Sequence, residues 1–101
     1  MGGLIGINDT WMRAEGSISN FNDIKESGIY HFFGGNINDA NGPIGAYNFG
    51  VLISSKASNK AVIHFYVPIL YSYSRYELYV RSMSETGSWQ AWRKITTNII
   101  D

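Results

Sequence analysis

The sequence predicts an all-β fold: a small antiparallel meander curled into a sandwich or half-barrel, with one short helical turn near the N-terminus. Three observations lead to this prediction. Apolar and polar residues alternate with period two in successive short segments, which is typical of half-buried strands. Glycine, asparagine, serine and proline residues mark turns between these segments. The chain of 101 residues is also 45% hydrophobic and 15% aromatic, enough for one small domain with its own core.

The first segment of the chain, residues 1–17, has only a weak pattern. Its apolar residues stand among polar ones and are Leu4, Ile5, Ile7, Trp11 and Met12. Such residues, if exposed, would dock onto a neighbouring domain or another copy of the chain. We therefore interpret residues 1–17 as a linker or interface segment of a longer chain, and residues 18–101 as the domain itself.

The domain begins with the helical turn and continues as strands. Asn20 or Asn22 can cap a short helical turn within residues 19–28, which is too short to be stable alone. Period-two patterns then predict strands at residues 29–33, 47–54 and 62–67. Gly50 is a candidate bulge within the second of these strands.

A C-terminal hairpin closes the meander and is predicted to be its packing centre. Its arms are residues 76–81 and 89–95, joined by a polar turn. Trp89, Trp92 and Ile95 are spaced by three, so all of them face the core only if the strand is interrupted between the tryptophans. Burying an indole contributes about 4–6 kcal/mol at ~25 cal/mol per Å².

Composition excludes several classes of partner. The formal net charge is zero, and the sequence has no run of lysines and arginines, so nucleic acid is not an expected partner. Cysteine is absent from the sequence, which removes disulfides and thiolate chemistry. No apolar run reaches the ~18 residues of a transmembrane helix, so we expect no membrane insertion.

The titratable residues do not predict an enzyme. His31 and His64 lie in strands with aromatic neighbours, where a structural or surface role is the simpler interpretation. Asp23 and Glu26 are the only carboxylates close in sequence, and the charge preference of a helix N-terminus explains them. We expect neither catalytic residues nor a cofactor.

Two arginines of the hairpin have aromatic neighbours. Arg81 and Arg93 are predicted to stack on Tyr79 and Trp92 through cation–π interactions, which would stabilise the hairpin. Binding of a ligand by either arginine is the alternative.

The loop of residues 36–42 is rich in asparagine. It has one aspartate, whereas a calcium loop needs several carboxylates at alternate positions. We interpret the loop as a turn cluster held by bonds between side chains and backbone, with no metal. Contact with a sugar is the remaining role for its amides.

A set of tyrosines near residue 73 has no apolar period that would place it in the core. Exposed tyrosines beside amides and an arginine suit saccharides, because the ring packs on the CH face of the sugar and the amides bond its hydroxyls. Covering a sheet edge or a subunit interface is the alternative. The candidate glycan-binding residues are Tyr71, Tyr73, Arg75 and Tyr76 on one loop, and Asn36, Asn38, Asp39 and Asn41 on the other.

Four motifs in this order resemble the knob domain of R-type pyocin tail fibres, which also occurs in bacteriophage tail-fibre and receptor-binding proteins. The motifs are residues 22–30 (NDIKESGIY), residues 41–43 (NGP) ahead of residues 50–53 (GVLI), residues 79–82 (YVRS) and residues 89–95 (WQAWRKI). The resemblance covers roughly residues 18–95. It implies structural core positions at Tyr30, Val51, Tyr79, Arg81, Trp89 and Trp92.

The resemblance also implies a function. It suggests a non-enzymatic host-attachment domain on a trimeric fibre of a phage or a phage-tail-like particle, which acts outside the cell on bacterial surface polysaccharide. Residues 1–17 would then continue from the upstream fibre, and the chain would be a homotrimer. A structural spacer or trimerisation module without its own receptor site is one alternative. A carbohydrate-binding domain attached to a secreted enzyme is another.

Overall fold

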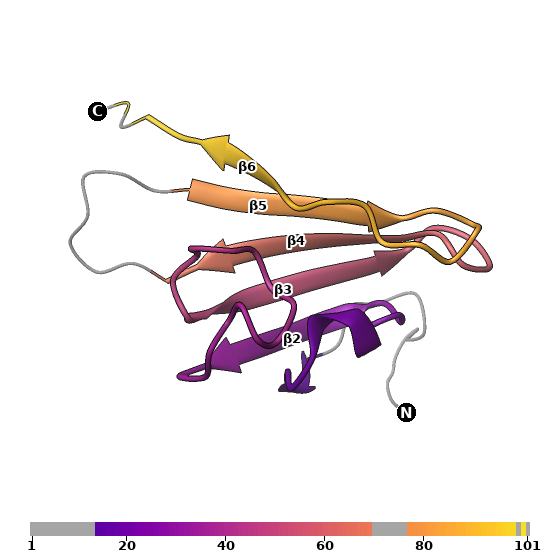
Figure 1. The fold of residues 1–101 in the computed structure, drawn as a ribbon, viewed down its shortest axis with the longest axis horizontal. Helices are drawn as coiled ribbons and strands as arrows, with labels where there is room; N and C mark the ends of the chain where they lie inside the picture. Colours follow the sequence, from indigo (N-terminus) through magenta and orange to yellow (C-terminus); the bar gives the residue numbers. More distant parts are fainter. Residues whose placement is uncertain (1–13, 70–76, 99, 101) are drawn as a thin grey trace.

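The computed structural model describes residues 14–69, 77–98 and 100, and its strands form one six-stranded sheet in chain order (Figure 1). The strands are β1 (Ala14–Ser17), β2 (Gly28–Phe33), β3 (Phe49–Lys56), β4 (Val62–Pro68), β5 (Glu77–Met83) and β6 (Arg93–Thr96), and the 3₁₀ helix η2 is Phe21–Asp23. The all-β prediction is confirmed. Within the described residues, no helix is both long enough and apolar enough to cross a membrane.

Strands β2 to β6 form the antiparallel meander that the period-two pattern predicts. The first strand is an addition to it: β1 pairs with β2 in parallel, with an irregular register between Ala14 and Ser17. The sequence of β1, AEGS, has no apolar alternation that would indicate a strand. It lies in the segment that we interpret as a linker or interface.

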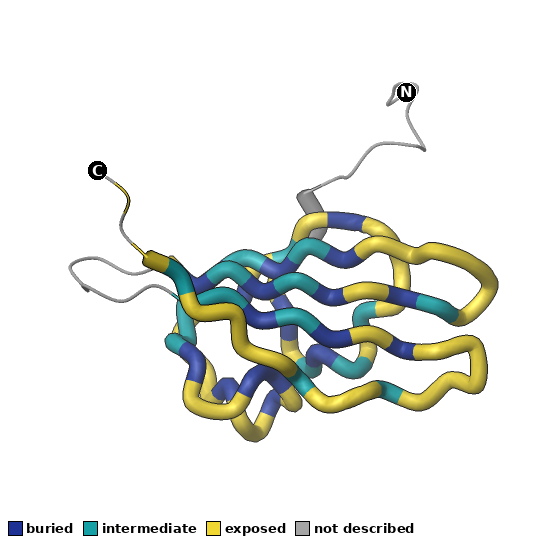
Figure 2. Tube along the Cα trace, turned by 90° about the horizontal axis from the view of Figure 1, so that it is seen from above, coloured by how far each residue is buried: buried dark blue, intermediate teal, exposed yellow. Residues whose placement is uncertain are grey.

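One face of the sheet, the inner face, holds the core. Cross-strand pairing aligns Leu52, Tyr66 and Tyr79 on β3, β4 and β5, and all three are buried. Figure 2 shows how buried and less buried residues alternate along these strands. The Tyr66 hydroxyl donates a hydrogen bond to the Tyr47 carbonyl at 2.8 Å, and burial raises the pKa of Tyr66.

Loops and the 3₁₀ helix, not a second sheet, cover the inner face. The loop between β2 and β3 crosses in front of these strands in Figure 1, and the chain between β5 and β6 also passes in front of the sheet. Phe21 of η2 is fully buried, with ring centroids 5.5 Å from Phe32, 5.6 Å from Tyr66 and 5.9 Å from Trp92. This ring therefore ties η2 to the sheet and to the C-terminal hairpin.

The helical turn is shorter than the sequence suggests. Asn20 caps η2, and its side-chain oxygen accepts a hydrogen bond from the Asn22 N–H at 2.9 Å. The backbone is already extended at Ile24, where φ is −87° and ψ is 102°. Helical conformation is thus limited to three residues.

Gly50 lies in regular pairing and not in a bulge. It pairs with Phe32 on β2 and with Pro68 on β4. A Cβ atom at this position would lie 2.7 Å from the Tyr66 ring and 2.7 Å from the Val67 carbonyl oxygen. Glycine is needed here because the Tyr66 ring packs directly on the backbone.

The opposite, outer face of β2 to β5 is mostly apolar and partly or fully exposed. Its residues are Ile29, His31, Phe33, Phe49, Val51, Ile53, Ser55, Ile63, Phe65, Val67, Leu78, Val80 and Ser82. This set contains no lysine, arginine, aspartate or glutamate. Phe33 is 71% exposed, and its ring lies 4.8 Å from that of its cross-strand partner Phe49.

The return arm of the hairpin is interrupted between its tryptophans, as their spacing predicts. Trp89 makes an isolated bridge to Met83, and regular pairing with β5 resumes only at Arg93. Both Trp89 and Trp92 consequently reach groups of the inner face. Ile95 does not, and it is 41% exposed.

Candidate functional site

The site is built around a buried pair of polar side chains on the inner face. Arg81 on β5 and His64 on β4 are direct cross-strand partners. His64 is fully buried, and Arg81 is 6% exposed. The Arg81 Nε–H donates a hydrogen bond to His64 Nδ1 at 3.3 Å.

These contacts fix the protonation state of His64. Because a guanidinium can only donate hydrogen bonds, Nδ1 is the acceptor and the ring proton lies on Nε2. That Nε2–H donates to the Ile24 carbonyl at 2.8 Å. Burial lowers the pKa of His64 to about 4, and the charge of Arg81 adds to this effect against the opposing hydrogen bond to Ile24. The imidazole is therefore neutral at physiological pH.

Both tryptophans of the hairpin contact this pair. The Arg81 guanidinium carbon lies 3.9 Å from the ring centroid of Trp89 and 4.6 Å from that of Trp92. The His64 ring is 4.4 Å from Trp89 and 6.0 Å from Trp92. The cation–π interaction predicted for Arg81 thus involves the two indoles and not Tyr79. Within the described chain, Arg93 makes no such contact.

Trp92 also connects the hairpin to the asparagine-rich loop. Its indole N–H donates a hydrogen bond to the Asn41 carbonyl at 3.1 Å. Asn41 has a positive φ of 63°, a conformation that asparagine tolerates better than most residues. Its side-chain amide donates to the Asn20 side chain at 3.0 Å, which joins the loop to the cap of η2.

The other amides of the loop also support the turn, as the sequence suggests. The Asn36 side-chain oxygen accepts hydrogen bonds from the backbone N–H groups of Asn38 and Asp39 at 3.0 and 3.1 Å. The Asn38 side-chain oxygen accepts one from the Gly45 N–H at 3.3 Å. The loop is therefore held in shape by its own side chains, although most of it is exposed.

A groove of about 510 Å³ separates this loop from the hairpin. Its walls combine indole rings, amides and cationic side chains. The lining residues are Asn22, Asn38, Asn41, Gly42, Pro43, Ile44, Tyr79, Arg81, Trp89, Gln90, Ala91, Trp92, Arg93 and Lys94. The mixture of apolar rings with a few polar groups is typical of small-ligand sites.

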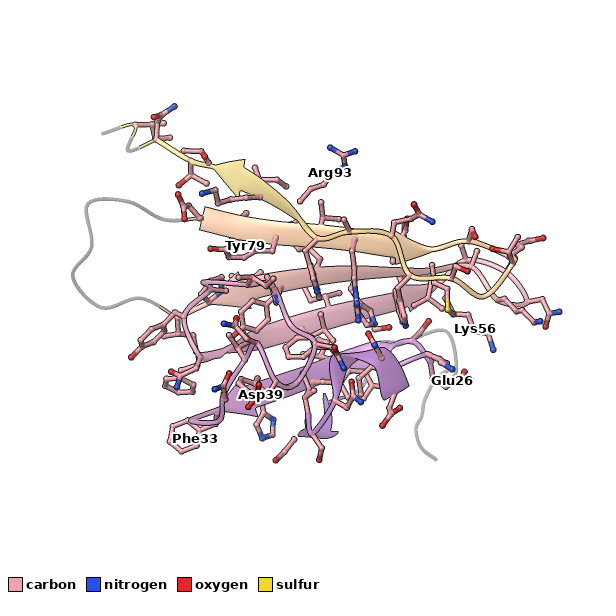
Figure 3. The ribbon with its side chains drawn as sticks, in the orientation of Figure 1. Glu26, Phe33, Asp39, Lys56, Tyr79 and Arg93 are labelled. Carbon is pink, nitrogen blue, oxygen red and sulfur yellow. The ribbon has the colours of Figure 1, made fainter. Side chains whose placement is uncertain are left out.

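The groove is positively charged although the chain as a whole is neutral. Arg81, Arg93 and Lys94 line it, and its lining contains no carboxylate. Burial lowers the pKa of Arg81 to about 10, so that side chain remains cationic at neutral pH. Lys94 lies at the rim with its Nζ 3.8 Å from Glu77 Oε2. Figure 3 shows the Arg93 guanidinium pointing away from the sheet at the edge formed by β6.

Two buried polar atoms among the lining residues have no hydrogen-bond partner. They are Arg81 Nη2, a donor, and Asn22 Oδ1, an acceptor. Most buried polar atoms in proteins are satisfied. Both atoms belong to residues that line the groove, although neither atom is itself exposed to solvent.

The structure brings only part of the predicted glycan-binding set to this groove. Asn38 and Asn41 line it, and Asn36 and Asn38 line a separate shallow hollow of about 620 Å³. Asp39 is exposed on the same loop, which crosses in front of the sheet in Figure 3. The other candidates lie outside the described residues and are Tyr71, Tyr73, Arg75 and Tyr76.

The predicted core positions have different environments. Tyr79 and Arg81 are buried on the inner face. Trp89 and Trp92 are half-buried at the groove. Tyr30 is half-buried, and its hydroxyl donates to the Glu26 carbonyl at 3.3 Å. Val51 is also half-buried but lies on the outer face, because it pairs with His31 and Val67.

Some groove residues were not selected by sequence reasoning. They include Asn22, Gln90 and Lys94, which lie in the quoted motifs but have no feature that assigns them to a binding site. The pairing of His64 with Arg81 was also not predicted. Period two puts Arg81 on the face of its strand opposite Leu78 and Val80, so the sequence pattern does not predict that Arg81 is buried.

The described residues contain few clusters of side chains that could act in catalysis or bind a metal. No group of three or more histidine, cysteine, aspartate or glutamate side chains could hold a metal ion there. Ser17 Oγ lies 3.3 Å from His31 Nε2, and both residues are exposed. Among the described side chains, no carboxylate bonds the other nitrogen of that imidazole.

No family model, curated protein or solved structure matches the chain. The function is therefore inferred from the geometry of the site and from the sequence motifs.

Proposed function

We propose that this chain is a non-enzymatic attachment domain that binds saccharide in the groove between the hairpin and the asparagine-rich loop. The observation that carries the proposal is the lining of the groove, where two indoles lie beside amide side chains. An indole ring packs on the apolar CH face of a sugar, and amides exchange hydrogen bonds with its hydroxyls.

The walls of the groove are fixed by internal contacts, which supports ligand binding there. Trp89 and Trp92 pack on the buried Arg81 guanidinium, and Trp92 is hydrogen-bonded to the opposite wall at Asn41. A wall that is already ordered loses little conformational entropy when a ligand binds. Such preorganisation suits recognition of flexible, hydrated polysaccharides.

The sequence motifs connect this binding to a biological setting. Their resemblance to tail-fibre knobs favours attachment of a phage or phage-tail-like fibre to bacterial surface polysaccharide, outside the cell. A fibre presents several copies, so one site needs only about millimolar affinity, or roughly 4 kcal/mol. Stacking on one indole with a few hydrogen bonds is sufficient for that.

A titration of the isotopically labelled chain with fragments of bacterial surface polysaccharide, followed by NMR, tests the proposal. We expect shifts of the two groove indole N–H signals and of the Asn38 and Asn41 backbone signals, without turnover. Trp89→Ala should lower the affinity obtained from the titration about fivefold, because stacking on this indole is lost. The control is Phe33→Ala, which removes an exposed ring from the opposite face and should leave binding unchanged.

Two results would count against the groove. Shifts confined to the exposed Ile29–Phe33 face would place binding elsewhere on the sheet. Shifts that require a divalent metal would indicate a different kind of site.

A second role, self-association, is favoured by the outer face. We propose that three copies of the chain associate through this face, as the resemblance to trimeric fibres suggests. The face is apolar and carries no lysine, arginine, aspartate or glutamate on β2 to β5, so identical copies meet there without like-charge repulsion. If the groove binds no ligand, this association alone would support the function of a structural trimerisation module.

A further inference from the structure

The charge distribution of the groove indicates what kind of saccharide it accepts. The sequence has eight basic and eight acidic residues, yet the groove collects three basic side chains and no acidic one. Lys94 has an acidic neighbour outside the lining, Glu77 at 3.8 Å, just as Lys56 has Glu26 at 3.2 Å. A neutral ligand would leave the charge of Arg81 without an opposite charge.

Arg81 lacks the partner that a buried arginine usually has. Buried charges in proteins are normally paired with an opposite charge. Among the described residues, Arg81 has contacts with His64 and the two indoles but no ion pair. Its Nη2 has no hydrogen-bond partner at all. The described residues therefore supply neither an opposite charge for Arg81 nor an acceptor for its Nη2.

The other buried atom without a partner needs a donor, whereas Arg81 Nη2 needs an acceptor. Asn22 Oδ1 is an acceptor without a donor and lines the same groove. A fully deprotonated anion has no hydrogen to give it. A hydroxylated ring that carries a negative group has both a donor that suits Asn22 and an acceptor that suits Arg81.

We infer that the groove binds an acidic saccharide, whose carboxylate or phosphate group is attracted by Arg81 and by Lys94 at the rim while its ring packs on the indoles. This inference rests on the proposed saccharide-binding function and adds the charge of the ligand. The shared chemistry is an anionic oxygen group on a sugar. It is found as a uronate carboxylate and as a sugar phosphate.

The test compares matched acidic and neutral sugars by NMR titration. One arm uses a disaccharide that contains glucuronic acid and its carboxyl-reduced neutral form, and the other uses a sugar phosphate and its dephosphorylated form. We expect the acidic member of at least one pair to bind about tenfold more tightly at about 50 mM salt, with much of this preference lost at about 300 mM. The arm that shows the preference identifies the anionic group.

Variants separate the charge effect from folding. Arg81→Met removes a buried group and is expected to reduce stability, so the main variant is Lys94→Gln, which is exposed at the rim. It should lower the affinity for the acidic sugar by a factor about threefold larger than that for the neutral sugar. Lys60→Gln, an exposed lysine outside the groove, is the matched control and should change neither.

The remaining outcomes of the titrations distinguish failure of the inference from failure of the proposed function. Equal affinity for acidic and neutral sugars overturns the inference and leaves the proposed function standing. If neither sugar binds, the proposed function fails and the inference fails with it. If inorganic phosphate alone binds as tightly as the sugar phosphate, the ring contributes nothing and the inference of an acidic saccharide is wrong.

Discussion

Arg81 illustrates how a cation is held inside this domain without a carboxylate among the described residues. Its guanidinium has two indoles as neighbours, at 3.9 and 4.6 Å, and a desolvated cation–π contact contributes about 2 kcal/mol. The hydrogen bond to His64 adds an acceptor that is neutral. Together these contacts offset part of the cost of removing the Arg81 charge from water. An anionic ligand beside Arg81 would offset more of this cost.

The pH dependence of stability follows from His64. Its pKa falls from 6.5 in the unfolded chain to about 4 in the folded one. Between these values the unfolded chain binds a proton that the folded chain does not, so the free energy of unfolding decreases as the pH falls from about 6.5 to about 4. The loss is roughly 3 kcal/mol in total, and the contribution is fully present above pH 6.5.

Denaturant unfolding across this pH range measures the effect. His64→Gln keeps a donor and an acceptor but does not titrate, so it should be less stable near pH 7 and should lose most of the slope. His31→Gln changes an exposed histidine and should keep the slope. A slope that is identical in the wild type and His64→Gln would contradict the assignment of a buried neutral imidazole.

At the scale of elements, local pattern was sufficient for most of the sheet. The predicted strands at residues 29–33, 47–54 and 62–67 correspond to β2, β3 and β4 with shifts of one or two residues at their ends. Alternation identifies these segments as strands, but it does not show which face is buried, because the apolar residues Phe49, Val51 and Ile53 lie on the outer face. β1 has no such alternation, and its existence depends on pairing with β2.

The candidate site was less accessible to sequence reasoning. The interruption of the return arm follows from the spacing of Trp89 and Trp92, a local feature. The position of Arg81 beside His64 depends on the register of β4 against β5, which no local pattern specifies. The groove requires in addition that the loop of residues 34–48 folds over the inner face, a contact between segments far apart in sequence.

Substitution of Gly50 tests the close packing of the Tyr66 ring on strand β3. Alanine there would place a methyl group 2.7 Å from the Tyr66 ring and 2.7 Å from the backbone oxygen of Val67. Because the backbone cannot move away cheaply in a central strand, we expect Gly50→Ala to reduce the free energy of unfolding by about 1–3 kcal/mol.

Gly16→Ala is the matched control for this measurement. Gly16 lies in the edge strand β1, and no heavy atom would come within 4 Å of an added Cβ. Its unfolding free energy should stay within about 0.5 kcal/mol of the wild type. If denaturant melts show equal stability for the two variants, the close packing of Tyr66 on β3 is wrong.

For the whole molecule, the two faces of the sheet divide the proposed roles. The inner face is covered by loops that form the core and the groove, and the outer face remains apolar and uncharged on β2 to β5. Contiguous apolar surface of this kind marks interaction sites in soluble proteins. Ligand binding and self-association can therefore occur together, because they use opposite sides of one layer.

The outer face makes a prediction about assembly. Sedimentation velocity should show a trimer that forms as the concentration rises into the micromolar range, with roughly 800 Å² buried per partner at each contact. Ile63→Lys places a charge in the middle of this face, on β4, where Ile63 is 47% exposed. It should shift the chain to monomer with little change in unfolding free energy, because the lysine is solvated in the monomer.

Ile100→Lys is the control: it changes an isoleucine that is 96% exposed and outside the sheet, and this variant should still form the trimer. A wild-type chain that remains monomeric at several hundred micromolar would refute association through the outer face, whereas a trimer that survives Ile63→Lys would move the interface to another surface.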